Sequence, residues 1–230
     1  ILVFMTHVIL CGDSIFDNRP YVQPPEPDVT TQVNALLPEV SKATRLAVDG
    51  DVTEDIHRQL QSLPNDATHL FISVGGNDAL GGINVFTEPV ANVGEALIYV
   101  NTMRNQFETR YKKMLQHALS QQLPLTVCSI YYPRFHSQNL ERVFPDGNGV
   151  NEETFQQMAM AALANFNDVI FRQAFQLKVP LIDLRVLCDE DADFANPIEP
   201  SAVGGQKIAR AIVDMLDSSE GSANKTTVYA

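Results

Sequence analysis

The sequence predicts an α/β protein: a three-layer α/β/α sandwich on a doubly wound, five-stranded parallel sheet. Short apolar runs alternate along the chain with longer segments of helical pattern, as they do in such folds. The runs are apolar throughout, which is typical of parallel strands covered on both faces. The 230 residues suit a single domain. We expect it to span residues 1–218, with a small, polar and flexible tail at 219–230.

Each element is placed by its local pattern. The expected strands are 7–11, 44–48, 69–74, 125–131 and 179–183. The expected helices are 28–38, 53–63, 93–121, 151–177 and 202–217. Residues that favour helix N-caps begin four of them, namely Asp28, Thr53, Asn151 and Ser201.

Composition excludes several classes of function. The 16 basic and 28 acidic residues give a net charge of −12, which disfavours nucleic acid and anionic membrane as partners. No apolar run reaches the roughly 18 residues of a membrane span. Cys11, Cys128 and Cys188 are far apart and adjoin apolar runs, so we interpret them as core thiols in a reducing compartment. We therefore expect a cytoplasmic protein without a metal or cofactor.

Polar residues follow the strands at their carboxyl ends, where α/β folds place their sites. These segments are 12–14 (GDS), 49–51 (DGD), 75–78 (GGND), 132–136 (YPRFH) and 196–201 (NPIEPS). Each could be an ordinary turn, because Gly, Asp and Ser are favoured there for backbone reasons. If the sheet is parallel, however, all five segments converge on one edge.

In this order the segments resemble the SGNH, or GDSL-type, hydrolase family, over roughly residues 7–217. The specific parts are GDSIFDN at 12–18 and GGND at 75–78. The resemblance implies a flavodoxin-like fold and hydrolysis of small ester or acyl substrates. It makes Ser14 the nucleophile, and makes the Ser14 N–H, the Gly50 N–H and the Asn77 amide the oxyanion hole. Donors so placed stabilise the charge of a tetrahedral intermediate. We expect Asp13 to be a hydrogen-bond partner within the turn.

The chain departs from the family pattern in the last segment. The family has Asp-x-x-His there, whereas this chain has Asn196 and Glu199. Our interpretation is that Glu199 replaces histidine as the base and that the Asn196 amide donates to it, because a carboxylate can only accept hydrogen bonds. An ordinary Glu is about two pKa units less basic than His. Burial would raise the pKa of Glu199 and donation from Asn196 would lower it, so the net direction stays open.

Other interpretations remain at this stage. His136, which follows the fourth strand, or less favourably His57 could serve as the base. Alternatively, hydrolysis is lost and the site binds an acyl or carbohydrate ligand, or the acyl group passes to an acceptor other than water. The aromatic residues Tyr131, Tyr132, Phe135 and Phe144 either shape a substrate pocket or belong to ordinary packing.

Overall fold

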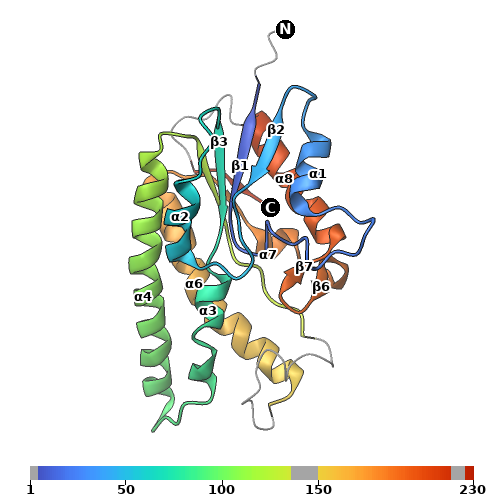
Figure 1. Cartoon of the computed structure of the whole chain (residues 1–230). Helices are drawn as coiled ribbons and strands as arrows, with labels where there is room; N and C mark the ends of the chain where they lie inside the picture. The colour runs from blue at the N-terminus through green and yellow to red at the C-terminus, as the bar shows by residue number, and fades with distance from the viewer. Residues whose placement is uncertain (1–4, 136–149, 219–225) are drawn as a thin grey trace.

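The computed structural model describes residues 5–135, 150–218 and 226–230. Its main sheet has six parallel strands in the order β2-β1-β3-β4-β5-β8 (Figure 1). The strands are β1 (His7–Gly12), β2 (Lys42–Arg45), β3 (His69–Ser73), β4 (Leu125–Cys128), β5 (Leu181–Ile182) and β8 (Val228–Tyr229). The predicted α/β class and parallel sheet are confirmed.

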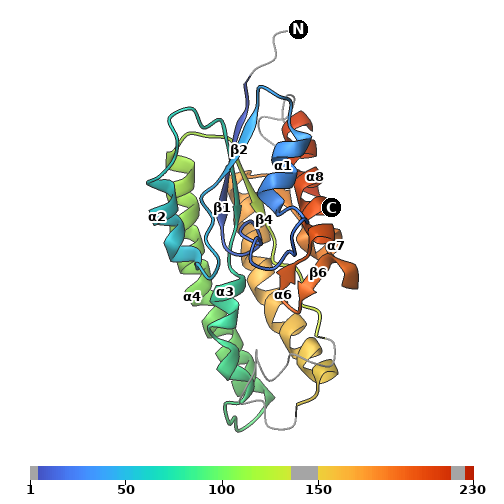
Figure 2. The same cartoon turned by 45° about the vertical axis from the view of Figure 1, so that its right-hand side comes forward.

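Helices cover both faces of this sheet (Figures 1 and 2). On one face lie α1 (Val29–Leu36), α7 (Leu184–Leu187) and α8 (Ala202–Ser218). On the other lie α2 (Ile56–Leu60), α4 (Val93–Ser120) and α6 (Glu152–Leu177). Within the described residues, no helix combines the length and apolar character needed to cross a membrane.

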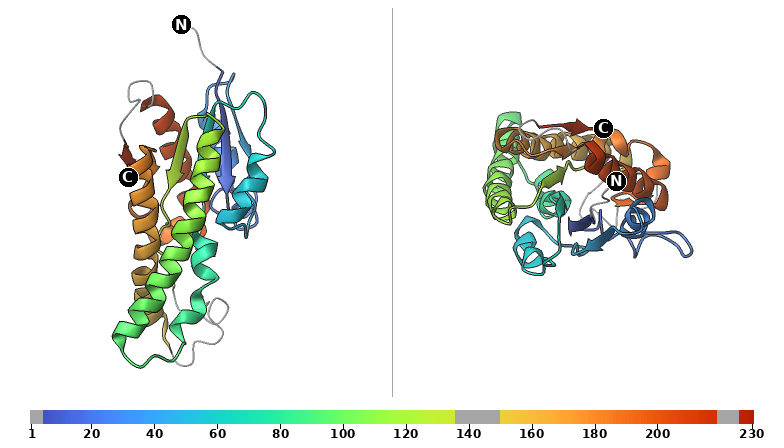
Figure 3. Two further views of the ribbon diagram at one scale, coloured as in Figure 1. Left: turned by 90° about the vertical axis from the view of Figure 1, so that its left-hand side faces the viewer. Right: turned by 90° about the horizontal axis from the view of Figure 1, so that it is seen from above.

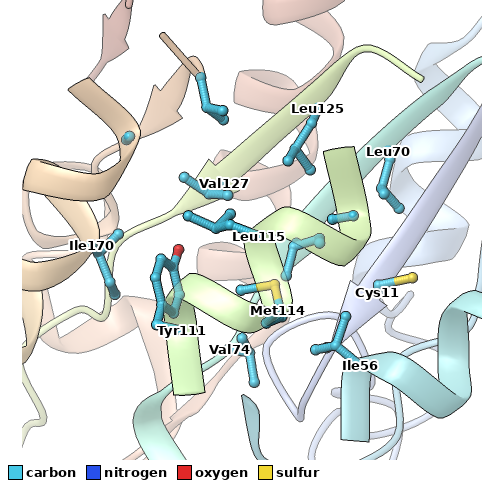
Figure 4. Close-up of a cluster of buried hydrophobic side chains, with 14 of the residues drawn as sticks. Cys11, Ile56, Leu70, Val74, Tyr111, Met114, Leu115, Leu125, Val127 and Ile170 are labelled. Atoms are coloured by element: carbon cyan, nitrogen blue, oxygen red, sulfur yellow. The ribbon is translucent and has the colours of Figure 1, made fainter. Parts of the chain in front are cut away.

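Each sheet face has its own apolar core. Figure 4 shows part of the larger one, in which Val127 of β4 packs with Leu115 of α4 and Ile170 of α6. The second core joins β1 and β3 to α1 and α8. Cys11, Cys128 and Cys188 are buried free thiols, as expected of core residues.

Several local predictions need correction. The sheet has six strands because part of the expected tail forms β8, which pairs with β5. The second strand is Lys42–Arg45, two residues before its expected start. Asp28, Asn151 and Ser201 do accept hydrogen bonds from helix N-terminal amides. Thr53 caps nothing; it begins the short helix η1 (Thr53–Asp55), and its hydroxyl donates to Asp78 at 2.7 Å.

Small elements that the sequence pattern did not reveal surround the carboxyl ends of the strands. They are α3 (Gly76–Leu80), η2 (Ile83–Phe86), η3 (Asp191–Asp193) and the hairpin of β6 (Phe194–Asn196) and β7 (Glu199–Pro200). The first halves of α4 and α6 extend past the sheet on the same side (Figure 3). The region beyond the strand ends is therefore built mainly from helices.

The end of β1 is held at very close range to β3. Gly12 has φ of +143°, and a Cβ there would lie 1.9 Å from the carbonyl oxygen of Ser73. The buried Gln59 of α2 accepts from the Gly12 N–H at 2.8 Å and donates to the Gly12 carbonyl at 2.7 Å. The next residues, Asp13 and Ser14, therefore leave the sheet from a tightly fixed point.

We expect Gly12→Ala to lower the free energy of unfolding by at least about 3 kcal/mol, because the new methyl group overlaps backbone atoms and the φ is strained for alanine. Urea denaturation measures the loss. Gly81→Ala is the matched control: its Cβ would have ordinary contacts of 3.4 Å and 3.7 Å, and its cost should stay within about 1 kcal/mol. Equal losses in the two variants would contradict the close approach.

We also expect Gln59→Leu to destabilise the fold by about 1–3 kcal/mol, since it leaves the buried Gly12 N–H without a partner and removes one of the two donors to the Gly12 carbonyl. Gln61→Leu removes an exposed amide from the end of the same helix and should change stability little. The comparison again requires only urea titrations. A neutral Gln59→Leu variant would show that Gly12 finds other partners.

Candidate active site

Ser14 lies in the turn directly after β1, and its side chain faces a cavity of about 120 Å³. The residue is 6% exposed. The turn is closed by Asp13, whose carbonyl accepts from the Phe16 N–H at 3.2 Å and whose carboxylate accepts from the Ile15 N–H at 3.2 Å. Asp13 thus has the turn contacts expected of it.

Glu199 enters the same cavity from the β6–β7 hairpin. Two side chains hold this hairpin: Asn18 donates to the Pro200 carbonyl at 3.2 Å, and the Tyr131 hydroxyl donates to the Ile198 carbonyl at 2.7 Å. Asn18 belongs to the GDSIFDN segment, so it ties the segment of Ser14 to that of Glu199. The Ser14 hydroxyl lies near the Glu199 carboxylate, where hydrogen bonding between the two groups lowers the pKa of Glu199.

Burial dominates the electrostatics of Glu199. The residue is 6% exposed, and loss of water around the carboxylate raises its pKa to about 7. The hydrogen bond from Ser14 works in the opposite direction, and the negative charge of Asp49 adds to the increase. Among the described residues, Glu199 Oε2 has no hydrogen-bond partner although it is buried. This carboxylate is therefore poorly compensated and changes charge near neutral pH.

Asp13 is a second buried carboxyl beside the first. Burial raises its pKa to about 8, and the charge of Glu199 contributes to the increase. Asp78, also close, is compensated: it accepts from the Thr53 N–H at 2.8 Å and pairs with Arg110 at 3.1 Å. Near pH 7 the site therefore keeps Asp13 largely protonated, while Glu199 is divided between its two forms.

Asn77 lies in the first turn of α3 and lines the cavity with Ser14 and Glu199. Its Nδ2 donates to the Asp51 carbonyl at 2.9 Å, which fixes the direction of the amide. An amide nitrogen carries two hydrogens, so a second donor is available. The structure therefore brings together Ser14, Asn77 and Glu199 from three separate segments.

Gly50 has a different setting. The Asp51 N–H donates to the Val48 carbonyl at 3.1 Å, and Gly50 has φ of +87° in this turn. A positive φ of this kind favours glycine, so the turn alone accounts for the residue type. The turn is joined to the site, because the Val48 N–H donates to Gly12 and the Asp51 carbonyl accepts from Asn77. Gly50 is not among the described residues that line the cavity.

Asn196 has contacts other than the ones expected. Its Oδ1 accepts from the backbone N–H of Ile198 at 3.0 Å, which closes the hairpin turn. Asn196 is paired with Glu199 through the β6–β7 ladder, but no hydrogen bond from its amide reaches the buried Glu199 Oε2. In this arrangement Asn196 shapes the turn that presents Glu199, whereas the expected side-chain donation is not observed.

The histidines of the chain, including the alternative bases His57 and His136, lie away from the cavity or outside the described residues. His57 packs against His117 with ring centroids 4.5 Å apart, and neither lines the cavity. His7 and His69 begin β1 and β3, at the opposite end of the sheet. His136 and Phe144 fall in 136–149, which the structure does not describe.

Apolar side chains form most of the cavity wall. Of the aromatic residues singled out from the sequence, Tyr131 and Phe135 line it and Tyr132 does not. Further wall residues come from η2 and α6, among them Ile83, Phe86 and Phe155. The sequence pattern did not predict these three wall residues, because apolar residues at such spacing also fit ordinary packing. Together, a hydroxyl, a carboxylate whose pKa is raised to about 7 by burial, and an amide donor lie at one end of an apolar cavity, and acyl transfer uses groups of these kinds.

Similarity to known protein families and solved structures agrees with this chemistry. The model of the GDSL-like Lipase/Acylhydrolase family matches residues 10–207. No curated protein sequence matches the chain.

Solved structures of similar fold include three enzymes. An extracellular lipase from Streptomyces rimosus is 15% identical with a TM-score of 0.62, covering 93% of this chain and 99% of its own. Phospholipase A1 from Streptomyces albidoflavus NA297 is 19% identical with a TM-score of 0.60, covering 94% and 99%. The M. smegmatis aryl esterase is 11% identical with a TM-score of 0.63, covering 93% and 99%. At these identities the structures support the fold, and the family model supports the chemistry: the chain is a hydrolase of the GDSL-like lipase/acylhydrolase family.

Proposed function

We propose that this protein is a serine esterase in which Ser14 is the nucleophile and Glu199 the general base. The observation that carries the proposal is that one cavity brings together the Ser14 hydroxyl and the buried carboxylate of Glu199, whose pKa is raised to about 7. A general base works best when its pKa lies near the working pH. Burial thus compensates for the low intrinsic basicity of a glutamate.

The reaction balances with these groups alone. Ser14 Oγ attacks the ester carbonyl carbon while its proton moves to Glu199, and the carbonyl oxygen becomes an oxyanion. Collapse of this intermediate breaks the bond to the alcohol, which receives the proton from Glu199 and leaves the acyl group on Ser14. Water then attacks the acyl group and gives a proton to Glu199. When the acid leaves, that proton returns to Ser14.

We also propose the donors for the oxyanion. The Asn77 amide, which lines the cavity and is held by the Asp51 carbonyl, supplies one N–H, and the backbone N–H of Ser14 supplies a second. The family pattern gives the Gly50 N–H as a third donor, although Gly50 does not line the cavity. Each such donor is worth about 3 kcal/mol of barrier in other serine hydrolases. Asp13, with its pKa at about 8, stays mostly neutral at pH 7 and adds little repulsion to the developing negative charge.

Substrate charge and location follow from the same features. A net charge of −12 and two carboxyls at the nucleophile favour small, neutral esters over anionic ones. The three buried thiols support a reducing compartment, the cytoplasm, as the location.

The nucleophile is tested with p-nitrophenyl butyrate. We expect Ser14→Ala to lower kcat/KM at least about a thousandfold, because it removes the hydroxyl that carries the acyl intermediate in the proposed mechanism. Ser62→Ala, which removes an exposed hydroxyl, is the control and should match the wild type. A fluorophosphonate should label Ser14, detected by peptide mass spectrometry. Equal activity of Ser14→Ala and the wild type would refute the proposal.

The base is tested by pH dependence. Since a base must be deprotonated, kcat/KM should fall tenfold per pH unit below about 7, following the raised pKa of Glu199, and should level off between about 7 and 8, before Asp13 loses its proton. Glu199→Gln should reduce the plateau about 10²–10⁴-fold and abolish this step. Glu54→Gln, which removes an exposed carboxylate, is the control and should keep both the plateau value of kcat/KM and its pH step. An unchanged step in Glu199→Gln would assign the base elsewhere.

A further inference from the structure

The cavity continues away from Ser14 as an apolar slot between two helical walls. Leu80, Ile83 and Phe86 of the α3–η2 segment form one wall. Phe155, Ala159 and Ala162 on the first half of α6 form the other. Both walls lie in the region beyond the strand ends, where α3 and α6 extend past the sheet (Figures 1 and 2).

The slot has its own apolar cluster, separate from the two cores of the sheet. Phe135, Phe155 and Ala159 are buried in it, and Ile83 and Phe86 pack against them. The ring of Phe155 meets Phe135 edge-on with centroids 4.7 Å apart, and Phe86 edge-on at 5.8 Å. This cluster surrounds a cavity instead of filling it, whereas interiors of proteins are normally close-packed.

Charge is confined to one end of the slot. Asp13 and Glu199 stand beside Ser14, and none of the described residues that line the cavity is basic. A phosphate or a free carboxylate inside the slot would have no positive charge to compensate it, so its burial would be unfavourable. A hydrocarbon chain would bind favourably there, because the slot removes its apolar surface from water.

We propose that this slot binds the acyl chain of the ester and that it selects neutral acyl groups of medium length. The proposal rests on the function proposed above, since it places the carbonyl carbon at Ser14. An apolar cavity of 150 Å³ in another protein holds benzene, which has six carbons. By that measure, the present cavity of about 120 Å³, which includes the end at Ser14, accommodates about five carbons, so acyl groups of about five or six carbons fit best.

The first test is a chain-length series of p-nitrophenyl esters. We expect kcat/KM to rise up to about fourfold per methylene from acetate to hexanoate, as burial of each methylene predicts. It should fall for octanoate and be lowest for palmitate. An optimum at acetate, or no dependence on length, would overturn the inference. Because every ester would still require Ser14, that result would leave the proposed function standing.

The second test changes the slot itself. Ala162→Phe fills it, so the ratio of kcat/KM for hexanoate to that for acetate should fall at least about tenfold. Ala164→Phe makes the same change on the exposed side of α6 and should leave the ratio unaltered. Phe86→Ala lengthens the slot and should move the optimum to octanoate, which keeps the inference testable if Ala162→Phe folds poorly. A ratio that stays unchanged in both slot variants would overturn the inference.

Binding gives a measurement that is independent of hydrolysis. Titration calorimetry of Ser14→Ala with neutral hexanamide and acetamide should show tighter binding of hexanamide, and adding Ala162→Phe should remove that preference. Equal affinities for the two amides would overturn the inference even if hydrolysis is never detected. Hexanamide preference without ester hydrolysis would support the slot and count against the proposed function.

Discussion

The close approach of Gly12 to the backbone of Ser73 is the constraint on which the site depends. No side chain fits between the two strands at that point, so β1 and β3 end side by side and deliver Ser14 and Asn77 to one edge. Gln59 satisfies both polar groups of Gly12 in the interior. The position of Ser14, the proposed nucleophile, is thus set by backbone contact, and a hydroxyl at a fixed point can be aligned with donors that are equally fixed.

The carboxylates near this edge of the sheet differ in how well their negative charge is compensated. Asp51 and Asp78 are compensated, by Arg58 and Gln59 in one case and by Arg110 in the other. Glu199, in contrast, keeps one buried oxygen without a partner. Such a group destabilises the folded state above the pKa of an ordinary Glu, because folding then buries a charge that water would solvate. In the proposed mechanism, poor solvation also makes Glu199 basic enough to act near neutral pH, so stability and the proposed activity oppose each other at this residue.

The sequence by itself determined the class of fold and the segments that form the site. Buried parallel strands are apolar throughout, and this local pattern revealed the five principal strands and placed GDS and GGND at strand ends. The helix caps Asp28 and Asn151 could also be predicted from the sequence, because capping involves residues only three positions apart. Strand patterns and helix caps depend only on residues that are close together along the chain, so the sequence alone is enough to predict them.

The tertiary structure decided what depends on distant segments. Strand β8 has only two residues and becomes a strand because β5 offers it an edge. No local sequence pattern around Gln59 predicts its contact with Gly12, which lies 47 residues earlier in the chain. The direction of the pKa shift of Glu199 was open because burial and hydrogen bonding oppose each other, and burial is the sum of contacts from several segments. Only the folded chain adds those contributions, so only the structure shows that burial prevails and that Asn196 closes a turn instead of donating to the carboxylate.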